Sequence, residues 1–142
     1  MQFSTILLVD DESAHSTLVE RNLRRVGLTS EIVKLENGQQ ALDWLEKMKD
    51  KNKEVNTPFI LLDINMPVKN GIEVLAEIKG NQNTCHIPVV MLSTTDSPEE
   101  IEQCYKLGCN AYITKPIMHD EFQEKIRELG LFMNIISLPK YH

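Results

Sequence analysis

The chain has 142 residues, 42% of them hydrophobic and 25% charged, which suits one globular domain with a buried core and leaves no room for a second domain of ordinary size. Its 15 basic and 21 acidic residues give a net charge of -6, which disfavours direct binding to the phosphates of a nucleic acid. The three cysteines form no CxxC pair, and the sequence contains no signal peptide and no membrane-length apolar run, so we expect a soluble cytoplasmic protein with reduced thiols.

Five short apolar runs predict strands. In chain order they cover residues 5–10, 31–35, 59–63, 88–92 and 111–114. Three of them contain the segments TILLV, FILL and PVVML, which are apolar on both faces of the pleat. Runs of this kind are typical of parallel strands that are covered by helices on both sides.

Helical periodicity separates the predicted strands. The first helix ends before Gly27, a second follows the Asn37-Gly38 turn, and a third ends at Gly80. The sequence SPEE at 97–100 predicts a capping box, with proline at the first position of a helix that ends at Gly108. A fifth helix begins near Asp120. Alternating strands and helices predict an α/β domain with right-handed crossovers.

Polar residues stand at the carboxyl end of four predicted strands, where ligands bind in open parallel sheets. They are Asp10, Asp11 and Glu12, then Asp63, then Ser93, Thr94 and Thr95, and finally Thr114 and Lys115. We therefore expect three carboxylates, several hydroxyls and one lysine to converge on a single edge of the sheet.

The carboxylates predict a divalent cation. Two unpaired carboxylates about 4 Å apart repel by roughly 4 kcal/mol at an effective dielectric constant of about 20. Oxygen-only ligands favour Mg²⁺, or Mn²⁺, as the ion that relieves this repulsion. Asp11 and Glu12 alone could instead cap the first helix. Asp63 favours the functional interpretation, because a carboxylate that ends an apolar strand is costly to bury without a partner.

Lys115 and Ser93 each fit both a structural and a functional interpretation. Lys115 could form a structural salt bridge with the acids, or it could bind an anion carried on Asp63. Ser93 could be an ordinary turn residue or a hydroxyl donor to that anion. Tyr112, alone on its strand, is most simply half-buried packing.

Four motifs give the sequence a family resemblance. VDDE at 9–12, LLDINMPVKNG at 61–71, LSTTDSPEE at 92–100 and GCNAYITKP at 108–116 resemble, in order and spacing, the receiver domain of bacterial response regulators. The resemblance covers residues from about 5 to 129 and implies the doubly wound, flavodoxin-like fold with a five-stranded parallel sheet in the order 2-1-3-4-5. Residues 1–142 would then form a single receiver domain, with 130–142 as a helical extension and tail.

The resemblance also implies roles for individual residues. Asp63 matches the phosphoacceptor. Asp10, Asp11 and Asp63, with the backbone carbonyl of Asn65, would hold Mg²⁺. Lys115 would pair with the phosphoryl group, and its bond to Pro116 would be cis. Ser93 and Tyr112 match the hydroxyl and aromatic switch residues. Thr94 stands where the family usually has a smaller residue, which would narrow access for the phosphodonor.

The implied function is signalling through a two-component phosphorelay. Asp63 would accept a phosphoryl group from a phosphohistidine of a sensor histidine kinase, the domain would switch conformation, and slow hydrolysis would reset it without the domain being a conventional enzyme. The kinase, the signal and the output are not encoded in these motifs, and a relay shuttle and a terminal regulator fit equally well.

Three other classes of protein fit the sequence less well. A hydrolase of the haloacid-dehalogenase kind needs a second acid two residues after its aspartate nucleophile, where this chain has Asn65. A flavodoxin needs a phosphate loop after the first strand, and the acids at 10–12 would repel that phosphate. A degenerate receiver that serves only as a scaffold would not need every key position filled.

The charged loop at about 50–58 and the apolar tail ending in SLPK look similar to stand-alone receivers that pair with bacterial phytochrome kinases. The apolar positions of the last helix fall on two sides. One stripe that can face the sheet consists of Phe122, Ile126, Leu129, Met133 and Ile136, and largely off it lie Leu131, Phe132, Ile135 and Leu138. The second set predicts a homodimer through that helix and the strand at 111–114. In the alternative, Gly130 ends the helix and the tail folds back over the core.

Overall fold

The computed structural model describes residues 5–25, 27–48, 57–115 and 120–137, with the backbone alone for Phe122 and residues 130–137. The strands are β1 (Thr5–Val9), β2 (Glu31–Leu35), β3 (Pro58–Asp63), β4 (Val89–Ser93) and β5 (Ala111–Thr114). The helices are α1 (Ser13–Arg25), α2 (Gly38–Met48), α3 (Gly71–Lys79), α4 (Pro98–Leu107) and α5 (Asp120–Ser137). Every predicted element is present, with shifts of one residue at several strand ends.

The sheet is fully parallel in the order β2-β1-β3-β4-β5, so the predicted flavodoxin-like topology is confirmed. Val9 at the end of β1 pairs with Leu62, and Asp63 at the end of β3 pairs with Leu92. Ser93 at the end of β4 pairs with Thr114 of β5. This register brings the carboxyl ends of the four strands to one edge of the sheet.

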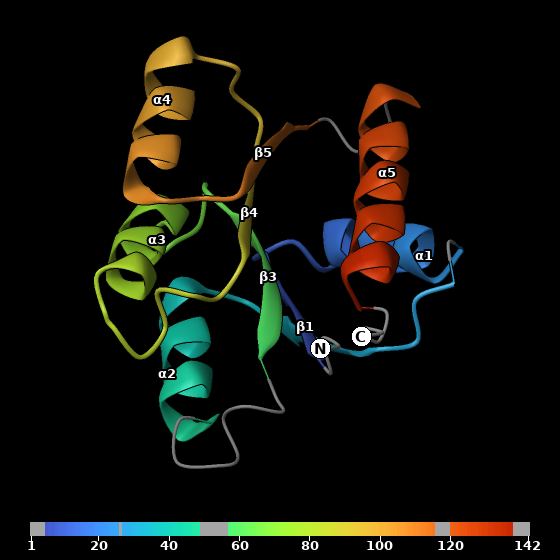
Figure 1. Ribbon diagram of the computed structural model, residues 1–142. Coiled ribbons are helices and arrows are strands. Elements are labelled where there is room, and N and C mark those ends of the chain that lie inside the picture. The colour runs from blue at the N-terminus through green and yellow to red at the C-terminus, as the bar shows by residue number, and fades with distance from the viewer. Residues whose placement is uncertain (1–4, 26, 49–56, 116–119, 138–142) are drawn as a thin grey trace.

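Helices cover both faces of the sheet (Figure 1), and a cluster of apolar side chains lies on each face. Helices α2, α3 and α4 pack on one face against a cluster that includes Leu7, Ile60 and Met91. Helices α1 and α5 pack on the other face against Leu8 and Leu61. Because side chains alternate along a strand, each strand contributes to both layers, which explains the runs that are apolar throughout.

The predicted capping box at the start of α4 is wrong. Ser97 is the N-cap residue, but its side chain makes no cap hydrogen bond and its hydroxyl donates to Glu99 Oε1 at 2.9 Å. The glutamate that would complete the box, Glu100, is bound elsewhere, to Ser93 and Tyr112. A reciprocal capping box is found instead at α3, between Asn70 and Glu73.

The last helix is continuous through Ser137, so Gly130 does not end it and the predicted extension is confirmed at the level of the backbone. Ile126 is fully buried and Leu129 half-buried against the α1 side of the core. Three predictions fall outside the described residues. They concern the side chains from 131 onward that would mediate dimerisation, most of the loop at 50–58, and the cis bond expected before Pro116. No described helix has the length and apolar character of a membrane span.

Candidate phosphoacceptor site

Three carboxylates meet at the carboxyl edge of the sheet, as predicted. Asp10 follows β1, Asp63 ends β3, and Asp11 precedes α1. One carboxylate oxygen from each lies within 4.8 Å of the others. Asp10 and Asp63 are buried while Asp11 is exposed, so the cluster opens to solvent on the Asp11 side.

Lys115 is the buried cation of the cluster. Its Nζ donates to Asp63 Oδ1 at 2.9 Å and to Asp10 Oδ2 at 3.0 Å. Its position is fixed by its own backbone, because the Lys115 N–H donates to the carbonyl of Ser93 at 2.6 Å. No described buried side-chain nitrogen or oxygen lacks a hydrogen-bond partner, so these buried charges are compensated.

Burial and pairing act against each other on the pKa values. Burial raises the pKa of Asp63 to about 6, although the hydrogen bond and charge of Lys115 oppose the rise. Burial alone would lower the pKa of Lys115, but the contacts with Asp63 and Asp10 outweigh it, so that pKa is raised. Near neutral pH, three carboxylates and one ammonium leave two negative charges, which a divalent cation would neutralise.

The donor set also fits such a cation. Carboxylate oxygens on a partly open edge are the ligands that Mg²⁺ uses, usually together with retained water. Asn65 lies two residues after the end of β3 and is exposed. Its side-chain amide donates to Thr94 Oγ1 at 3.3 Å, which ties this residue to the loop after β4. The role of its backbone carbonyl as a metal ligand stays a prediction.

The loop that carries Asn65 is held tightly against β3. Gly71 N–H donates to the carbonyl of Ile64 at 2.9 Å. A Cβ at Gly71 would lie 2.3 Å from the carbonyl oxygen of Asp63, so only glycine fits. Val68 in the same loop has a φ of 70°, which is strained for a β-branched residue. Such strain is often found beside functional sites.

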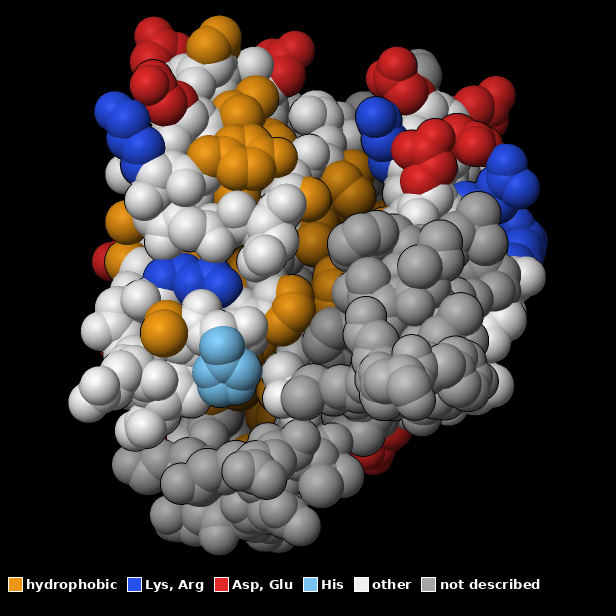
Figure 2. Space-filling model, in the orientation of Figure 1, with side chains coloured by type: hydrophobic (Ala, Val, Ile, Leu, Met, Phe, Trp, Pro, Cys, Tyr) orange, Lys and Arg blue, Asp and Glu red, His pale blue; other side chains and the backbone are white. Residues whose placement is uncertain are grey.

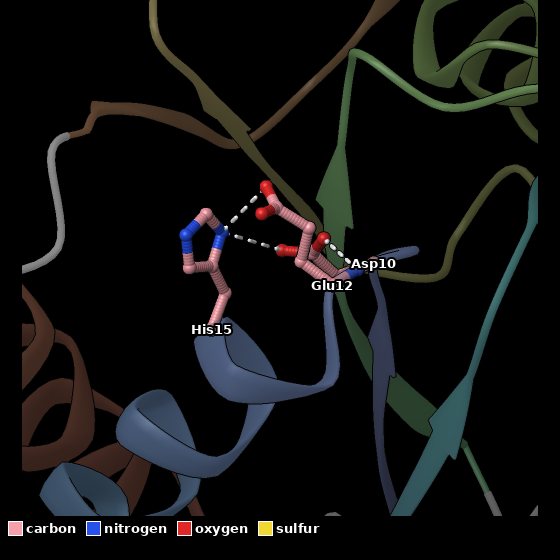
Figure 3. A group of neighbouring side chains, drawn as sticks. All are labelled: Asp10, Glu12 and His15. Carbon is pink, nitrogen blue, oxygen red and sulfur yellow. Dashed lines mark hydrogen bonds and ion pairs between the residues drawn. The ribbon is translucent and has the colours of Figure 1, made fainter.

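His15 belongs to the site and was missed by the sequence analysis. Its Nδ1 lies 3.3 Å from Glu12 Oε1, 3.7 Å from Asp10 Oδ2 and 3.2 Å from Lys115 Nζ. Figure 3 shows the imidazole reaching from the first turn of α1 toward both carboxylates. The sequence contained a signal for this contact. His15 follows Asp10 by five residues, and the first turn of α1 places its side chain beside the end of β1.

Ser93 and Tyr112 form a second cluster, on the α4 side of the sheet. Ser93 Oγ donates to Glu100 Oε2 at 3.2 Å and accepts the Thr95 N–H at 3.1 Å. The Tyr112 hydroxyl lies 2.8 Å from Glu100 Oε2 and 2.9 Å from the Thr95 carbonyl. Side chains alternate between the two faces of the sheet, which explains why Ser93 and Tyr112 lie apart from Asp63 and Lys115. Met91 and Tyr112 pack in the core on the α4 side, whereas Leu61 and Ile113 pack in the core on the α1 side. Asp63 and Lys115 each follow one of the latter two residues by two positions, so they lie on the same face.

Three comparisons agree with this architecture. Residues 6–127 match the family described as response regulator receiver domain. The response regulator Rcp1 of Synechocystis sp. is 39% identical over 135 residues, covering 94% of this chain and 92% of Rcp1. Its solved Mn²⁺-bound form superimposes with a TM-score of 0.81 at 33% identity, covering 96% of this chain and 99% of that one.

Two further solved structures are similar over nearly their whole length. A response regulator receiver domain from Rhodospirillum rubrum has a TM-score of 0.84 at 38% identity, covering 97% of this chain and 99% of that one. The phosphorylated cyanobacterial phytochrome response regulator RcpA has a TM-score of 0.80 at 32% identity, covering 96% of this chain and 97% of that one.

Proposed function

The chain belongs to the response regulator receiver domains of two-component signalling, and from that membership we propose that Asp63 accepts a phosphoryl group from a phosphohistidine of a sensor histidine kinase. The observation that carries the proposal is a buried aspartate with a raised pKa, paired with Lys115, at the end of β3. A carboxylate in that position is hard to explain by packing alone.

In the proposed reaction, an oxygen of the Asp63 carboxylate attacks phosphorus while the bond from phosphorus to the histidine nitrogen breaks. The kinase imidazole leaves with the electron pair of that bond. Lys115 Nζ, already 2.9 Å from Asp63 Oδ1, then offers hydrogen bonds to the phosphoryl oxygens. Attack by water on phosphorus later breaks the bond between phosphorus and the Asp63 oxygen, which releases inorganic phosphate and restores the carboxylate. The domain thus acts as a signalling phosphoacceptor that turns over only its own phosphoryl group.

The proposed metal is Mg²⁺, or Mn²⁺, held by the carboxylates of Asp10, Asp11 and Asp63 and by the backbone carbonyl of Asn65. The cation would supply charge neutralisation of the phosphoryl oxygens during transfer. Two negative charges left over in the cluster support this assignment, and so does the similarity to Rcp1, whose solved form contains Mn²⁺.

The proposed switch uses Ser93 and Tyr112. Once Asp63 is phosphorylated, the Ser93 hydroxyl would turn to a phosphoryl oxygen and the Tyr112 ring would follow into the vacated space. This change would bias an equilibrium that exists without phosphorylation, and a differential affinity of about 1.4 kcal/mol changes the population ratio tenfold.

The proposed partner is a histidine kinase of the phytochrome type, acting in the cytoplasm where ATP supplies the phosphoryl group. Support comes from the similarity to RcpA, which is a phytochrome response regulator. The competing class, an aspartyl-phosphate hydrolase, is disfavoured by Asn65, because its amide cannot act as a general acid.

The test of the proposal is phosphorylation by a small-molecule donor. The protein is incubated with phosphoramidate, with and without Mg²⁺, and its intact mass is measured. Gain of one phosphoryl group that depends on Mg²⁺ supports the function, and absence of any gain in the folded protein contradicts it.

Divalent cations should stabilise the protein through the acid cluster. At a Mg²⁺ concentration about tenfold above Kd, mass action adds about 1.4 kcal/mol, or about 5 °C in Tm for a domain of this size. Asp11→Ala should abolish most of that rise. Asp43→Ala is the matched control, because this exposed acid on α2 should leave the rise intact. A wild-type melting curve that stays unchanged across a wide Mg²⁺ titration would argue against the metal site.

Residues 1–142 are proposed to form one receiver domain, with a core at about 5–129 and a tail at 130–142 that pairs two copies through α5 and β5. A groove of about 540 Å³ between these elements supports this, since Val90, Ala111, Ile113 and Leu129 line it. Figure 2 shows hydrophobic side chains gathered in the hollow between the α4 and α5 sides.

The dimer can be tested by sedimentation velocity on the wild type and on the double variant Phe132→Asp with Ile135→Asp, each with and without phosphorylation. We expect a wild-type dimer at roughly tens of micromolar and a monomeric double variant, because two charges would be buried in the interface. If the wild type is monomeric in every state, the interface is excluded and the tail serves the core of a single copy.

A further inference from the structure

Glu100 joins the two proposed switch residues through a single oxygen atom. Its Oε2 accepts the Ser93 hydroxyl at 3.2 Å and lies 2.8 Å from the Tyr112 hydroxyl. These residues come from three different elements, α4, β4 and β5. No role for Glu100 follows from the motifs or from the proposed phosphoryl transfer, so the contact requires its own explanation.

The position of Glu100 on α4 makes this contact possible. It is the third residue of the helix, where the partial positive charge of the N-terminus favours a carboxylate. It would complete a capping box there, yet its carboxylate turns to the sheet and Ser97 bonds to Glu99 instead. The half-buried carboxylate therefore gives up a local cap in favour of contacts with β4 and β5.

The contacts with Glu100 occupy the hydroxyl hydrogens that the proposed switch would need. A serine hydroxyl has one hydrogen to donate, and that of Ser93 is donated to Glu100. It cannot be given to a phosphoryl oxygen on Asp63 until this bond breaks. The Tyr112 hydroxyl likewise has one hydrogen, which is held between Glu100 Oε2 and the Thr95 carbonyl. Both side chains are held by a charged acceptor, and such bonds are about twice as strong as neutral ones.

We propose that Glu100 is a positioning residue that holds Ser93 and Tyr112 in the unphosphorylated arrangement and thereby sets how strongly phosphorylation must bias the switch. This inference rests on the proposed function of Asp63. Without Glu100, both hydroxyls keep a partner, because Ser93 Oγ still accepts the Thr95 N–H and Tyr112 still reaches the Thr95 carbonyl. Substitution of Glu100 should therefore shift the switch and leave the fold intact.

The probe is beryllofluoride, BeF₃⁻, an analogue of the phosphoryl group, whose affinity is measured by titration calorimetry at saturating Mg²⁺. Glu100→Ala should bind it about tenfold more tightly than the wild type, because binding no longer has to break the Glu100 contacts. Glu100→Gln keeps a neutral acceptor and should gain only about threefold. The matched control is Glu99→Ala, which removes the neighbouring exposed carboxylate that contacts only Ser97 among the hydrogen bonds described.

A spectroscopic readout separates positioning from a general effect of charge. In protein labelled with 3-fluorotyrosine, the Tyr112 ¹⁹F resonance, assigned by Tyr112→Phe, should move in ligand-free Glu100→Ala toward its position in the BeF₃⁻-bound wild type. An affinity for BeF₃⁻ unchanged in Glu100→Ala, or equal gains in the Ala and Gln variants, would overturn the proposal while leaving the Asp63 assignment intact. Failure of the wild type itself to bind BeF₃⁻ would overturn both.

Discussion

Asp63→Asn should gain no phosphoryl group from phosphoramidate under conditions in which the wild type gains one. The substitution replaces the nucleophilic carboxylate with an amide of nearly the same shape, so the neighbouring packing is kept and the chemistry is lost. Phosphorylation is measured by intact mass with Mg²⁺ present. Asp43→Asn is the control, because it makes the same change at an exposed acid on α2 and should be phosphorylated at the wild-type rate.

The same variant has a signature in the pH dependence of stability. The pKa of Asp63 is raised from 3.8 to about 6 in the folded protein. Between these values the folded state keeps a proton that the unfolded state releases, so the contribution of Asp63 to the free energy of unfolding falls as pH rises through this window. Metal-free Asp63→Asn should lack that fall. In the phosphoramidate experiment, a gain of phosphoryl groups by Asp63→Asn equal to that of the wild type would show that another residue is the acceptor.

The fold was predictable because its determinants are local and repeated. Buried parallel strands must be apolar on both faces, and TILLV, FILL and PVVML are visible as such without any knowledge of the contacts. The convergence of Asp10, Asp63 and Lys115 was equally predictable, since parallel strands bring their carboxyl ends to one edge. The strand order itself came from the family resemblance and not from the pattern.

The errors arise where a side chain has two possible partners. Ser97 and Glu100 have the spacing of a capping box, but Glu100 finds two hydroxyl donors on the neighbouring strands. Sequence spacing carries no information about that competition, because Ser93 and Tyr112 become neighbours of Glu100 only through tertiary packing. His15 is a different case, because it follows Asp10 by only five residues and its contact with that carboxylate could have been found from the sequence. Only its contact with Lys115, at 3.2 Å, depends on tertiary packing.

Replacing Lys115 with methionine should cause the largest loss of stability. The substitution keeps most of the apolar stem and removes the ammonium that pairs with two buried carboxylates. Removing one partner of a buried ion pair costs about 3–5 kcal/mol, because the remaining charge is left without compensation. We expect a loss of about that size in urea denaturation at neutral pH in EDTA. Lys106→Met is the control, because its ion pair with Glu102 is exposed and should contribute less than about 1 kcal/mol.

Two conditions should reverse part of this loss, and they identify its cause. Mg²⁺ should stabilise Lys115→Met more than it stabilises the wild type, because the cation then becomes the main positive charge beside Asp10 and Asp63. Lowering the pH should also help, since loss of the lysine removes the interaction that holds the pKa of Asp63 down, so that carboxyl takes up a proton more readily. A loss of stability that is the same at every pH and Mg²⁺ concentration would instead indicate damaged packing. In that case the ion pair would not be what stabilises the site, and the net negative charge from which the divalent cation was inferred would need another explanation.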